Sequence, residues 1–342
     1  MPNEVNIYEI AREAGVSIAT VSRVINNSSS VSEKKRRQVM EVVKRLNYVP
    51  SSAAKILSTS TSNLVGVVIP DINNPFFMQI LQGITEESDM HHFHLFLCNT
   101  DEQPEREQQV LLALRQYSLQ GVIIAPVQEN SRATLEILQG YESRGVPVVL
   151  MDRLLQGANF DCVSANDRQG SFDAVSKLIS LGHTRIATIT GPETSRPGRE
   201  RHLGYLQAME AAGIAVRPEY VRPGNFRVER AYTLAMALCK LPLPPTAIYS
   251  SNNMTTYGCL KAFQELGLQP GKDIALIGFD DIEPLNWLNY HLSVVNRDAK
   301  QMGCEAMRLL LQHFADAKTQ TGSVCLPTEL ILRGSEQCSA PM

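Results

Sequence analysis

The sequence predicts a small all-α headpiece at the N-terminus, followed by a large α/β core of two Rossmann-like lobes with parallel sheets. From residue 64 onward, apolar strands alternate with amphipathic helices, which is the pattern of parallel sheets joined by right-handed crossovers. Before residue 50, three short helical segments follow one another without a strand between them. Residues 1–62 hold nine Lys or Arg and five Asp or Glu, whereas the remainder holds 23 and 30. A basic module on an acidic body indicates a polyanionic partner that only one end touches.

The headpiece is predicted from helical spacing and turn chemistry. Three helices are expected, over residues 7–14, 18–26 and 33–46. Gly15 supplies the permissive backbone for a tight turn after the first helix, and Ser17 and Ser32 are candidate N-caps of the second and third. The arrangement is helix, short turn, helix and a bracing third helix, so the second helix can enter a DNA major groove.

The outer face of the second helix carries side chains that suit DNA. Ile18 and Ala19 can contact thymine methyl groups, and Arg23 can donate two hydrogen bonds to guanine. Ser22 lies on the same face, and hydroxyl groups that can donate to phosphates belong to Tyr8, Ser17, Thr20 and Tyr48. From spacing alone, an ordinary solvated helix surface stays open as the alternative.

The contiguous run AGVSIATVSRVIN, within residues 7–57, resembles the helix-turn-helix headpiece of the LacI/GalR family of transcription regulators. The resemblance implies a headpiece over residues 1–50 and a hinge helix with linker over residues 51–62. It also implies DNA contacts by Asn26, Ser51, Ala54, Lys55 and Leu57, with Leu57 inserted between base pairs. Ser51 and Lys55 stand where the family usually has asparagine and arginine.

The expected hinge helix has a physical reason to form only on DNA. About eight residues are too few for an isolated helix to be stable, so it should need a second copy beside it. Two subunits must also present their apolar wedges together to recover the cost of unstacking the bases. We therefore expect a homodimer on a roughly palindromic double-stranded operator. The C-terminal SEQCSAPM has no leucine heptads and does not support a tetramer-forming tail.

In the core, polar and aromatic residues follow the predicted strands. The strands are expected within residues 64–70, 94–99, 121–126, 146–152, 184–190, 246–252 and 273–281. Open parallel sheets bind ligands at the carboxyl ends of their strands, so residues there are candidates for a ligand site. Carboxylates and planar donors can grip neighbouring hydroxyl groups, which suits a small polyol.

Residues 62–335 also resemble the periplasmic-binding-protein-like core of the LacI family, through HTRIATITGP, IGFDDI and LPTELILRGS. NNPFF with a later MDR is more narrowly similar to ribose-binding proteins and ribose operon repressors. The match implies ring stacking on Phe76, Phe77 and Phe226. It implies hydroxyl binding by Asn74, Asp152, Arg153, Asn252 and Asp280, and by Arg201, which we expect in a loop after the strand at 184–190.

Two departures from the family pattern affect this site. Asn253 replaces the usual aspartate, and Arg297-Asp298 replaces the usual glutamine-proline. Arg297 is expected to add a cation near the ligand, so an acidic sugar derivative or a sugar phosphate stays an alternative effector. The core, residues 63–342, is expected to divide into an N-lobe of about 63–161 and 293–324 and a C-lobe of about 162–292 and 325–338.

These observations imply a repressor of a carbohydrate operon, controlled by a small sugar, ribose, that binds between the lobes. The open alternatives for its signal are another sugar, a nucleoside or a phosphorylated carrier protein. The alternative of a different class is a sugar-binding transport protein. An enzyme is not expected, because GxxxxGK[ST], HExxH and GxSxG are absent and Asp280 and Asp281 should point apart.

No cofactor or metal site is expected, and His91, His92 and His94 are interpreted as surface residues. Apolar runs are far shorter than the roughly 20 residues of a membrane span, and the N-terminal residues lack a secretory pattern. Seven cysteines without CxxC spacing suit reduced thiols. We therefore expect a cytoplasmic protein without a membrane partner.

Overall fold

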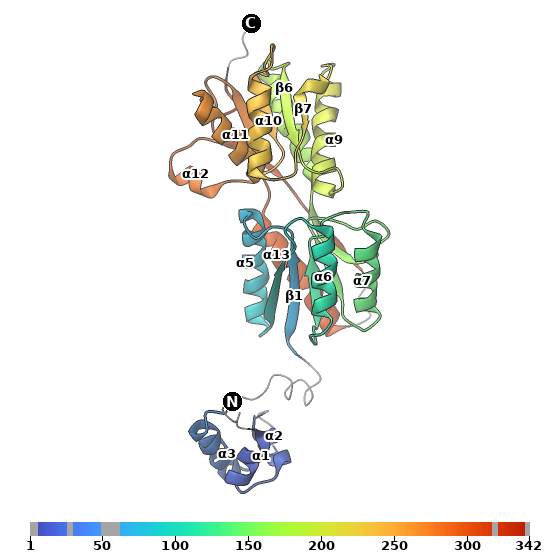
Figure 1. Cartoon of the computed structure of the whole chain (residues 1–342), viewed down its shortest axis with the longest axis vertical. Helices are drawn as coiled ribbons and strands as arrows, with labels where there is room; N and C mark the ends of the chain where they lie inside the picture. The colour runs from blue at the N-terminus through green and yellow to red at the C-terminus, as the bar shows by residue number, and fades with distance from the viewer. Residues whose placement is uncertain (1–5, 26–29, 49–61, 317–320, 339–342) are drawn as a thin grey trace. The chain divides into compact units, whose positions relative to one another are not determined.

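The computed structural model describes residues 6–25, 30–48, 62–316 and 321–338. The chain divides into two compact units, residues 1–63 and 64–342 (Figure 1). The first unit contains the predicted headpiece helices, and the second contains two six-stranded sheets with helices on both faces. Each unit has a hydrophobic core of its own.

The headpiece is built from three helices, α1 (Ile7–Glu13), α2 (Ile18–Ile25) and α3 (Glu33–Arg45). Ile10, Val21, Val24 and Val39 are fully buried between them. Gly15 has a φ of 58°, the left-handed backbone that the tight turn requires.

Capping explains where the headpiece helices begin. The Ser17 hydroxyl accepts a hydrogen bond from the Thr20 N–H at 3.2 Å, which confirms the predicted cap of α2. Ser32 has the extended backbone of an N-cap, but its side chain makes no capping hydrogen bond. A capping box that was not predicted begins α1: the Asn6 side chain accepts from the Glu9 N–H, and the Glu9 side chain accepts from the Asn6 N–H.

The predicted hinge helix lies outside the described residues. The same holds for the predicted DNA contacts of Asn26, Ser51, Ala54, Lys55 and Leu57, which therefore stay predictions.

The first lobe of the core is a parallel sheet in the order β11-β5-β4-β3-β1-β2. Its strands are β1 (Leu64–Ile69), β2 (His94–Asn99), β3 (Gly121–Ile124), β4 (Val148–Met151), β5 (Asp161–Ala165) and β11 (Ser323–Leu326). Helices α5 (Pro75–Met90) and α13 (Ala299–Ala315) pack on one face, and α6 (Pro104–Leu114) and α7 (Arg132–Glu142) pack on the other.

The second lobe repeats this plan in the order β12-β10-β9-β8-β6-β7. Its strands are β6 (Ile186–Thr190), β7 (Val221–Pro223), β8 (Ala247–Ser250), β9 (Ala275–Phe279), β10 (Ser293–Asn296) and β12 (Glu329–Ile331). Helices α8 (Asp167–Ser180) and α9 (Arg196–Ala211) cover one face, and α10 (Val228–Cys239) and α11 (Asn253–Leu266) cover the other. The short α12 (Glu283–Trp287) follows β9. One pair departs from the predicted parallel pattern, because β12 runs antiparallel to β10.

The predicted lobe boundaries need correction. β5 belongs to the first sheet, where it pairs with β4, although the boundary at 161/162 assigned it to the second lobe. β10 pairs with β9 in the second sheet, so the boundary at 292/293 was also early by one strand. β11, which the boundary at 324/325 divides, lies wholly in the first sheet. Apolar periodicity shows that a strand exists, but it does not show which sheet the strand joins.

The backbones of α5 and α13 approach each other closely at two glycines. A Cβ atom on Gly83 would lie 2.0 Å from the Lys300 carbonyl oxygen, and one on Gly303 would lie 2.0 Å from the Ile80 carbonyl oxygen. Larger side chains at either position would separate the helices. This contact fixes the helix that follows Arg297 against the helix that begins beside Asn74.

The chain passes between the lobes three times, after β5, β10 and β11. The carboxyl ends of both sheets and these three crossovers supply the residues of the candidate ligand site.

Candidate functional site

The structure brings all ten predicted effector residues into the lining of one cavity, together with Asp71, Glu102 and Pro197. The predicted residues in this lining are Asn74, Phe76, Phe77, Asp152, Arg153, Arg201, Phe226, Asn252, Asp280 and Arg297. They come from both lobes and follow strands far apart in the chain. The cavity has room for little more than one water molecule, about 20 Å³, because its own charged side chains fill it.

Arg297 lies at the centre of this group. It stands on the crossover between β10 and α13, and only 2 % of its side chain is exposed. Its Nη1 donates to Asp152, which follows β4 of the first lobe, and its Nε donates to Asp280 of the second lobe at 2.7 Å. The guanidinium carbon is 3.8 Å from the centre of the Phe76 ring. The cation expected at Arg297 is therefore already shared between two carboxylates and one aromatic face.

Arg201 lies in the second turn of α9, which corrects the prediction of a loop. The run RERHLGY continues a helix that Ser195 caps, and Pro197 within its first turn is compatible with a helix. Arg201 is buried, and its Nε and Nη2 both donate to one oxygen of Asp167, at 2.9 and 2.8 Å. Its Nη1 donates to the Ser251 carbonyl at 2.6 Å.

Arg153 is held by a two-pronged ion pair with Glu102. The two nitrogen–oxygen distances are 2.7 and 2.6 Å, and the guanidinium carbon lies 5.9 Å from the centre of the Phe226 ring. Every arginine of the cavity thus contacts an acidic partner, and each also faces an aromatic ring.

Burial and ion pairing together shift the pKa values of Asp152 and Arg297. Burial alone would raise the pKa of Asp152, but attraction to Arg297, Arg153 and Arg201 outweighs burial and lowers it. Burial would lower the pKa of Arg297, yet Asp152, Asp280 and Asp167 raise it above its ordinary value. Asp152 and Arg297 are therefore both charged at neutral pH.

The two predicted asparagines act first as helix caps. The Asn74 oxygen accepts from the Phe76 N–H at 3.0 Å and from the Asn253 amide at 2.9 Å, which links the two lobes. The Asn252 oxygen accepts from the Thr255 N–H at 2.8 Å and caps α11. Asn253, where the family usually has aspartate, thus forms a hydrogen bond between the lobes.

The aromatic side chains serve both the core and the cavity. Phe76 and Phe77 are buried in the core of the first lobe and contact each other edge to face, with ring centres 5.2 Å apart. Phe226 lies directly against the backbone of Gly191, where a Cβ atom would be 2.1 Å from the ring. Gly191 is therefore required to leave this ring in the cavity.

Three cavity residues have the left-handed backbone that is unusual outside glycine. The φ values are 62° for Asp152, 60° for Phe226 and 65° for Asp280. Such conformations persist where surrounding contacts determine them, and they concentrate at functional sites. Asp280 faces Arg297, whereas Asp281 pairs with Arg333, so the two adjacent aspartates do point apart as predicted.

Three residues of the lining, and one partner of Arg201, were not among the predicted effector residues. Asp71 and Glu102 follow the ends of β1 and β2, where the strand-end rule could have selected them. Pro197 stands beside Arg201 in the lining. Asp167 was hidden because β5, the strand before it, reads DCVSA and is too short and polar for a periodicity signal.

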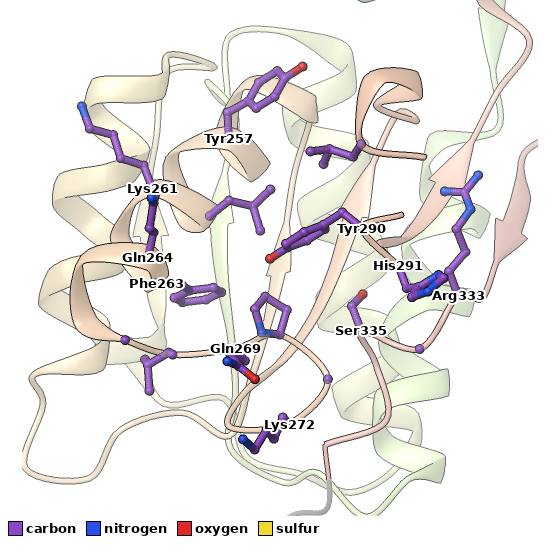
Figure 2. Close-up of a pocket in the computed structure, with 17 residues that line it drawn as sticks. Tyr257, Lys261, Phe263, Gln264, Gln269, Lys272, Tyr290, His291, Arg333 and Ser335 are labelled. Carbon is purple, nitrogen blue, oxygen red and sulfur yellow. The ribbon is translucent and has the colours of Figure 1, made fainter. Parts of the chain in front are cut away.

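A second cavity, of about 920 Å³, opens beside α11 and contains none of the predicted residues. Figure 2 shows Tyr257, Phe263 and Tyr290 around it, with Lys261 and Lys272 at its margins. Its charged side chains do not converge on one point, whereas those of the smaller cavity do. We therefore take the smaller cavity as the candidate effector site.

The headpiece presents the predicted DNA-facing side chains on its surface. Tyr8 is 68 % exposed and Ile18 is 42 % exposed, although both are large and hydrophobic. Ser17, Ala19 and Arg23 are also exposed, Thr20 and Ser22 are half-buried, and Val21 and Val24 face the core. Tyr48 is half-buried and its ring packs against the headpiece core. The exposed face of α2 is thus the face assigned to the major groove.

Within residues 6–25, 30–48, 62–316 and 321–338, no helix combines the length and apolar character of a membrane span. In the same ranges, no three His, Cys, Asp or Glu side chains lie together as a group that could hold a metal ion. His91, His92 and His94 are exposed, as predicted.

Both units of the chain match families of known proteins. Residues 6–51 match the model described as bacterial regulatory proteins of the lacI family, and residues 62–333 match periplasmic binding proteins and the sugar-binding domain of the LacI family. The HTH-type transcriptional regulator DegA of Bacillus subtilis is 32% identical over 96% of this chain and 97% of its own. The ribose operon repressor of Escherichia coli is 33% identical over 96% and 98%.

A solved structure supports the same arrangement of elements. The lac repressor dimer bound to operator and an anti-inducer is similar with a TM-score of 0.84 and 26% identity, covering 98% of this chain and 99% of the other. The two family models together span nearly the whole chain, in the order headpiece then core. The chain therefore belongs to the LacI family of DNA-binding bacterial regulatory proteins.

Proposed function

We propose that this regulator represses a carbohydrate operon and responds to a small neutral sugar, ribose, held between the two lobes of its core. The observation that carries the proposal is the convergence of the ten predicted effector residues on one cavity, from both lobes. The similarity to the ribose operon repressor of Escherichia coli supports the choice of sugar.

The operator contact is assigned to the exposed face of α2. Ile18 and Ala19 would meet thymine methyl groups, Arg23 would donate to a guanine, and Ser22 lies beside them. Tyr8, Ser17, Thr20 and Tyr48 would donate to phosphates and fix the helix in the groove. Residues 51–62 would provide the hinge, with Leu57 as its wedge and Asn26, Ser51, Ala54 and Lys55 as further contacts.

The charges of the cavity favour a neutral ligand. Its lining contains four carboxylates, Asp71, Glu102, Asp152 and Asp280, and only three arginines. Each arginine already has an acidic partner. A sugar phosphate would bring further negative charge into a buried region without an unpaired cation, which is costly. A polyol instead offers hydroxyl groups that both donate to carboxylates and accept from arginines.

A homodimer is proposed from the apolar surface of the core. Trp287 and Leu288 are adjacent at the end of α12 and are exposed at 73 and 77 %, which is high for side chains of this size. An exposed apolar pair of this size is expected at an interaction surface. The lac repressor is a dimer on its operator, and a palindromic operator would pair with two copies of this chain in the same way. Replacing both Trp287 and Leu288 with Ser should convert the dimer to a monomer in light scattering.

We further propose that the protein acts in the cytoplasm, where its DNA partner lies, and that it is not an enzyme. The relatives are transcriptional regulators, and the charged residues of the cavity are engaged with one another.

DNA binding is tested with the purified protein and genomic fragments. Selection of bound fragments should yield a roughly palindromic sequence, and fluorescence anisotropy should show that Arg23→Ala loses affinity mainly for that sequence. One bidentate base contact is worth about 1–3 kcal/mol of discrimination. Arg132→Ala, a change at an exposed ion pair of the core, is the matched control. Equal loss on selected and random DNA would contradict a base contact by Arg23.

The effector is tested by calorimetric titration with ribose, other pentoses, ribose 5-phosphate and nucleosides. Ribose should bind, and Phe226→Ala should weaken it by at least tenfold because one ring face is lost. Tight binding of the phosphate but not of ribose would contradict the charge argument. Binding of none of these compounds would favour a phosphorylated carrier protein as the signal.

A further inference from the structure

Arg297 covers an aromatic ring of the candidate effector site. Its guanidinium covers the Phe76 ring, one of the aromatic faces assigned to sugar stacking, at 3.8 Å from the ring centre. At that distance nothing else can lie on this face of the ring. The guanidinium therefore occupies the volume that a sugar stacked on this face of the ring would need.

The same guanidinium joins the two lobes. Asp152 is fixed at the end of β4 in the first lobe, and Asp280 is fixed at the end of β9 in the second. Arg297 donates to both, and its Nη1 is also 3.7 Å from Asp167. All four side chains are almost completely buried. Parting the lobes would break the contact with Asp152 while Asp280 could stay with Arg297.

Two other ion-paired contacts between the lobes are more exposed. Arg227 of the second lobe pairs with Asp71 and Asp101 of the first, and Arg199 pairs with Glu129. The side chains of Arg227 and Arg199 are 28 and 39 % exposed, so water and salt weaken these pairs. Within the described part of the chain, Arg297 makes the charged contact between the lobes whose side chains are almost completely buried.

We propose that Arg297 is an internal latch that determines which ligands the cleft accepts: it holds the lobes together by filling the sugar-stacking position, and an effector enters only by displacing it from Phe76. Arg297 can hold both lobes by itself because it lies on the crossover between them and is almost completely buried. When Arg297 swings away, Asp152 and Asp280 face the incoming molecule. A neutral polyol with several hydroxyl donors satisfies both carboxylates, whereas a hydrophobic or anionic molecule does not.

The latch itself is tested without any sugar. Arg297→Gln should part the lobes, because two buried carboxylates lose their shared cation and must reach water. Small-angle scattering of the full-length protein should then show a larger radius of gyration than for the wild type. Hydrogen exchange should rise in peptides covering 149–156 and 276–282. Arg168→Gln is the matched control, because Arg168 pairs with Glu200 within the second lobe and is half exposed.

A second variant keeps the proposal testable if Arg297→Gln fails to fold. Arg297→Lys retains the charge but has one ammonium group, which lacks the planar fork that bridges Asp152 and Asp280. It should give an intermediate increase in exchange at 149–156. Wild-type exchange in both the Lys variant and any folded Gln variant would overturn the latch.

Competition with the effector rests on the proposed function and is measured separately, by titrating ribose into each variant. Ribose should bind Arg297→Gln at least tenfold more tightly than the wild type, since no latch has to be displaced. If the Gln variant opens but ribose binds neither protein, the latch stands and the proposed effector is wrong. If ribose binds the wild type and the Gln variant equally, Arg297 does not compete with the ligand and the proposal fails.

Discussion

Replacing Arg201 with Ala should destabilise the core rather than act only on a ligand. The side chain is 2% exposed and donates twice to Asp167 and once to the Ser251 carbonyl. Its guanidinium also lies 3.6 Å from the centre of the Phe279 ring. Truncation would leave Asp167, whose side chain is fully buried, without its main partner. Breaking a buried ion pair from one side costs about 3–5 kcal/mol.

Two other cations reduce this cost. Arg196 and Arg297 lie 3.4 and 3.7 Å from the oxygens of Asp167, so the lower end, about 3 kcal/mol, is expected. For a unit of this size, 1 kcal/mol corresponds to roughly 2–4 °C in Tm, so the core transition should fall by about 6–12 °C.

Differential scanning calorimetry at pH 7.5 measures this fall. Arg168→Ala is the control and should change Tm little, because exposed ion pairs contribute about 0–1 kcal/mol. Adding Asp167→Asn to Arg201→Ala should recover part of the loss, since the unpaired charge is then gone. A fall below about 2 °C, or a further fall in the double variant, would refute the assignment of Arg201 as the buried partner of Asp167.

Three further predictions concern packing and pH. Gly83→Ala should cost about 1–3 kcal/mol in thermal unfolding, because its Cβ would meet the Lys300 carbonyl; an unchanged Tm would show that the helices separate freely. Gly191→Ala should push Phe226 out of the cavity and weaken ribose binding at least tenfold with little change in Tm; undiminished affinity would place the sugar elsewhere. Burial lowers the pKa of His183 below its ordinary 6.5, so the fold favours the neutral ring and stability is lost as pH falls below about 6.5. The drop in Tm between pH 7.5 and 5.5 should shrink in His183→Gln, and an equal drop would exclude this histidine as a cause.

The strands and the site differ in how far the sequence predicts them. All seven predicted strands exist, because apolar runs such as Leu64–Ile69 are buried on both faces and leave a clear pattern. The short strands β5, β7, β10, β11 and β12 were not predicted, and most of them mix polar and apolar side chains within three to five residues. Which strands pair with each other depends on contacts between segments far apart in the chain, and the periodicity of one segment carries no information about such contacts.

The membership of the site was predicted better than its chemistry. The strand-end rule and the family resemblance together selected ten residues that line one cavity. They did not indicate that Arg297, Asp152 and Asp280 satisfy one another, or that Asn74 caps a helix. Such pairings depend on how the two lobes are placed relative to each other. A sequence shows which residue types follow each strand, but it does not show which strand ends face each other across the cleft.

The three passages of the chain between the lobes bear on how the protein is made. The first lobe begins at β1, but its core lacks α13 and its edge strand β11 until the ribosome has also produced the whole of β6 to β10. At about 5–20 residues per second, the nascent first lobe waits on the order of ten seconds with the face that receives α13 uncovered. The apolar residues of α5, β3, β4 and β5 that α13 covers in the folded core would be exposed during that interval. Chaperone demand during synthesis should therefore be set by the segment from α13 to β12, residues 299–331, which completes both lobes almost at once.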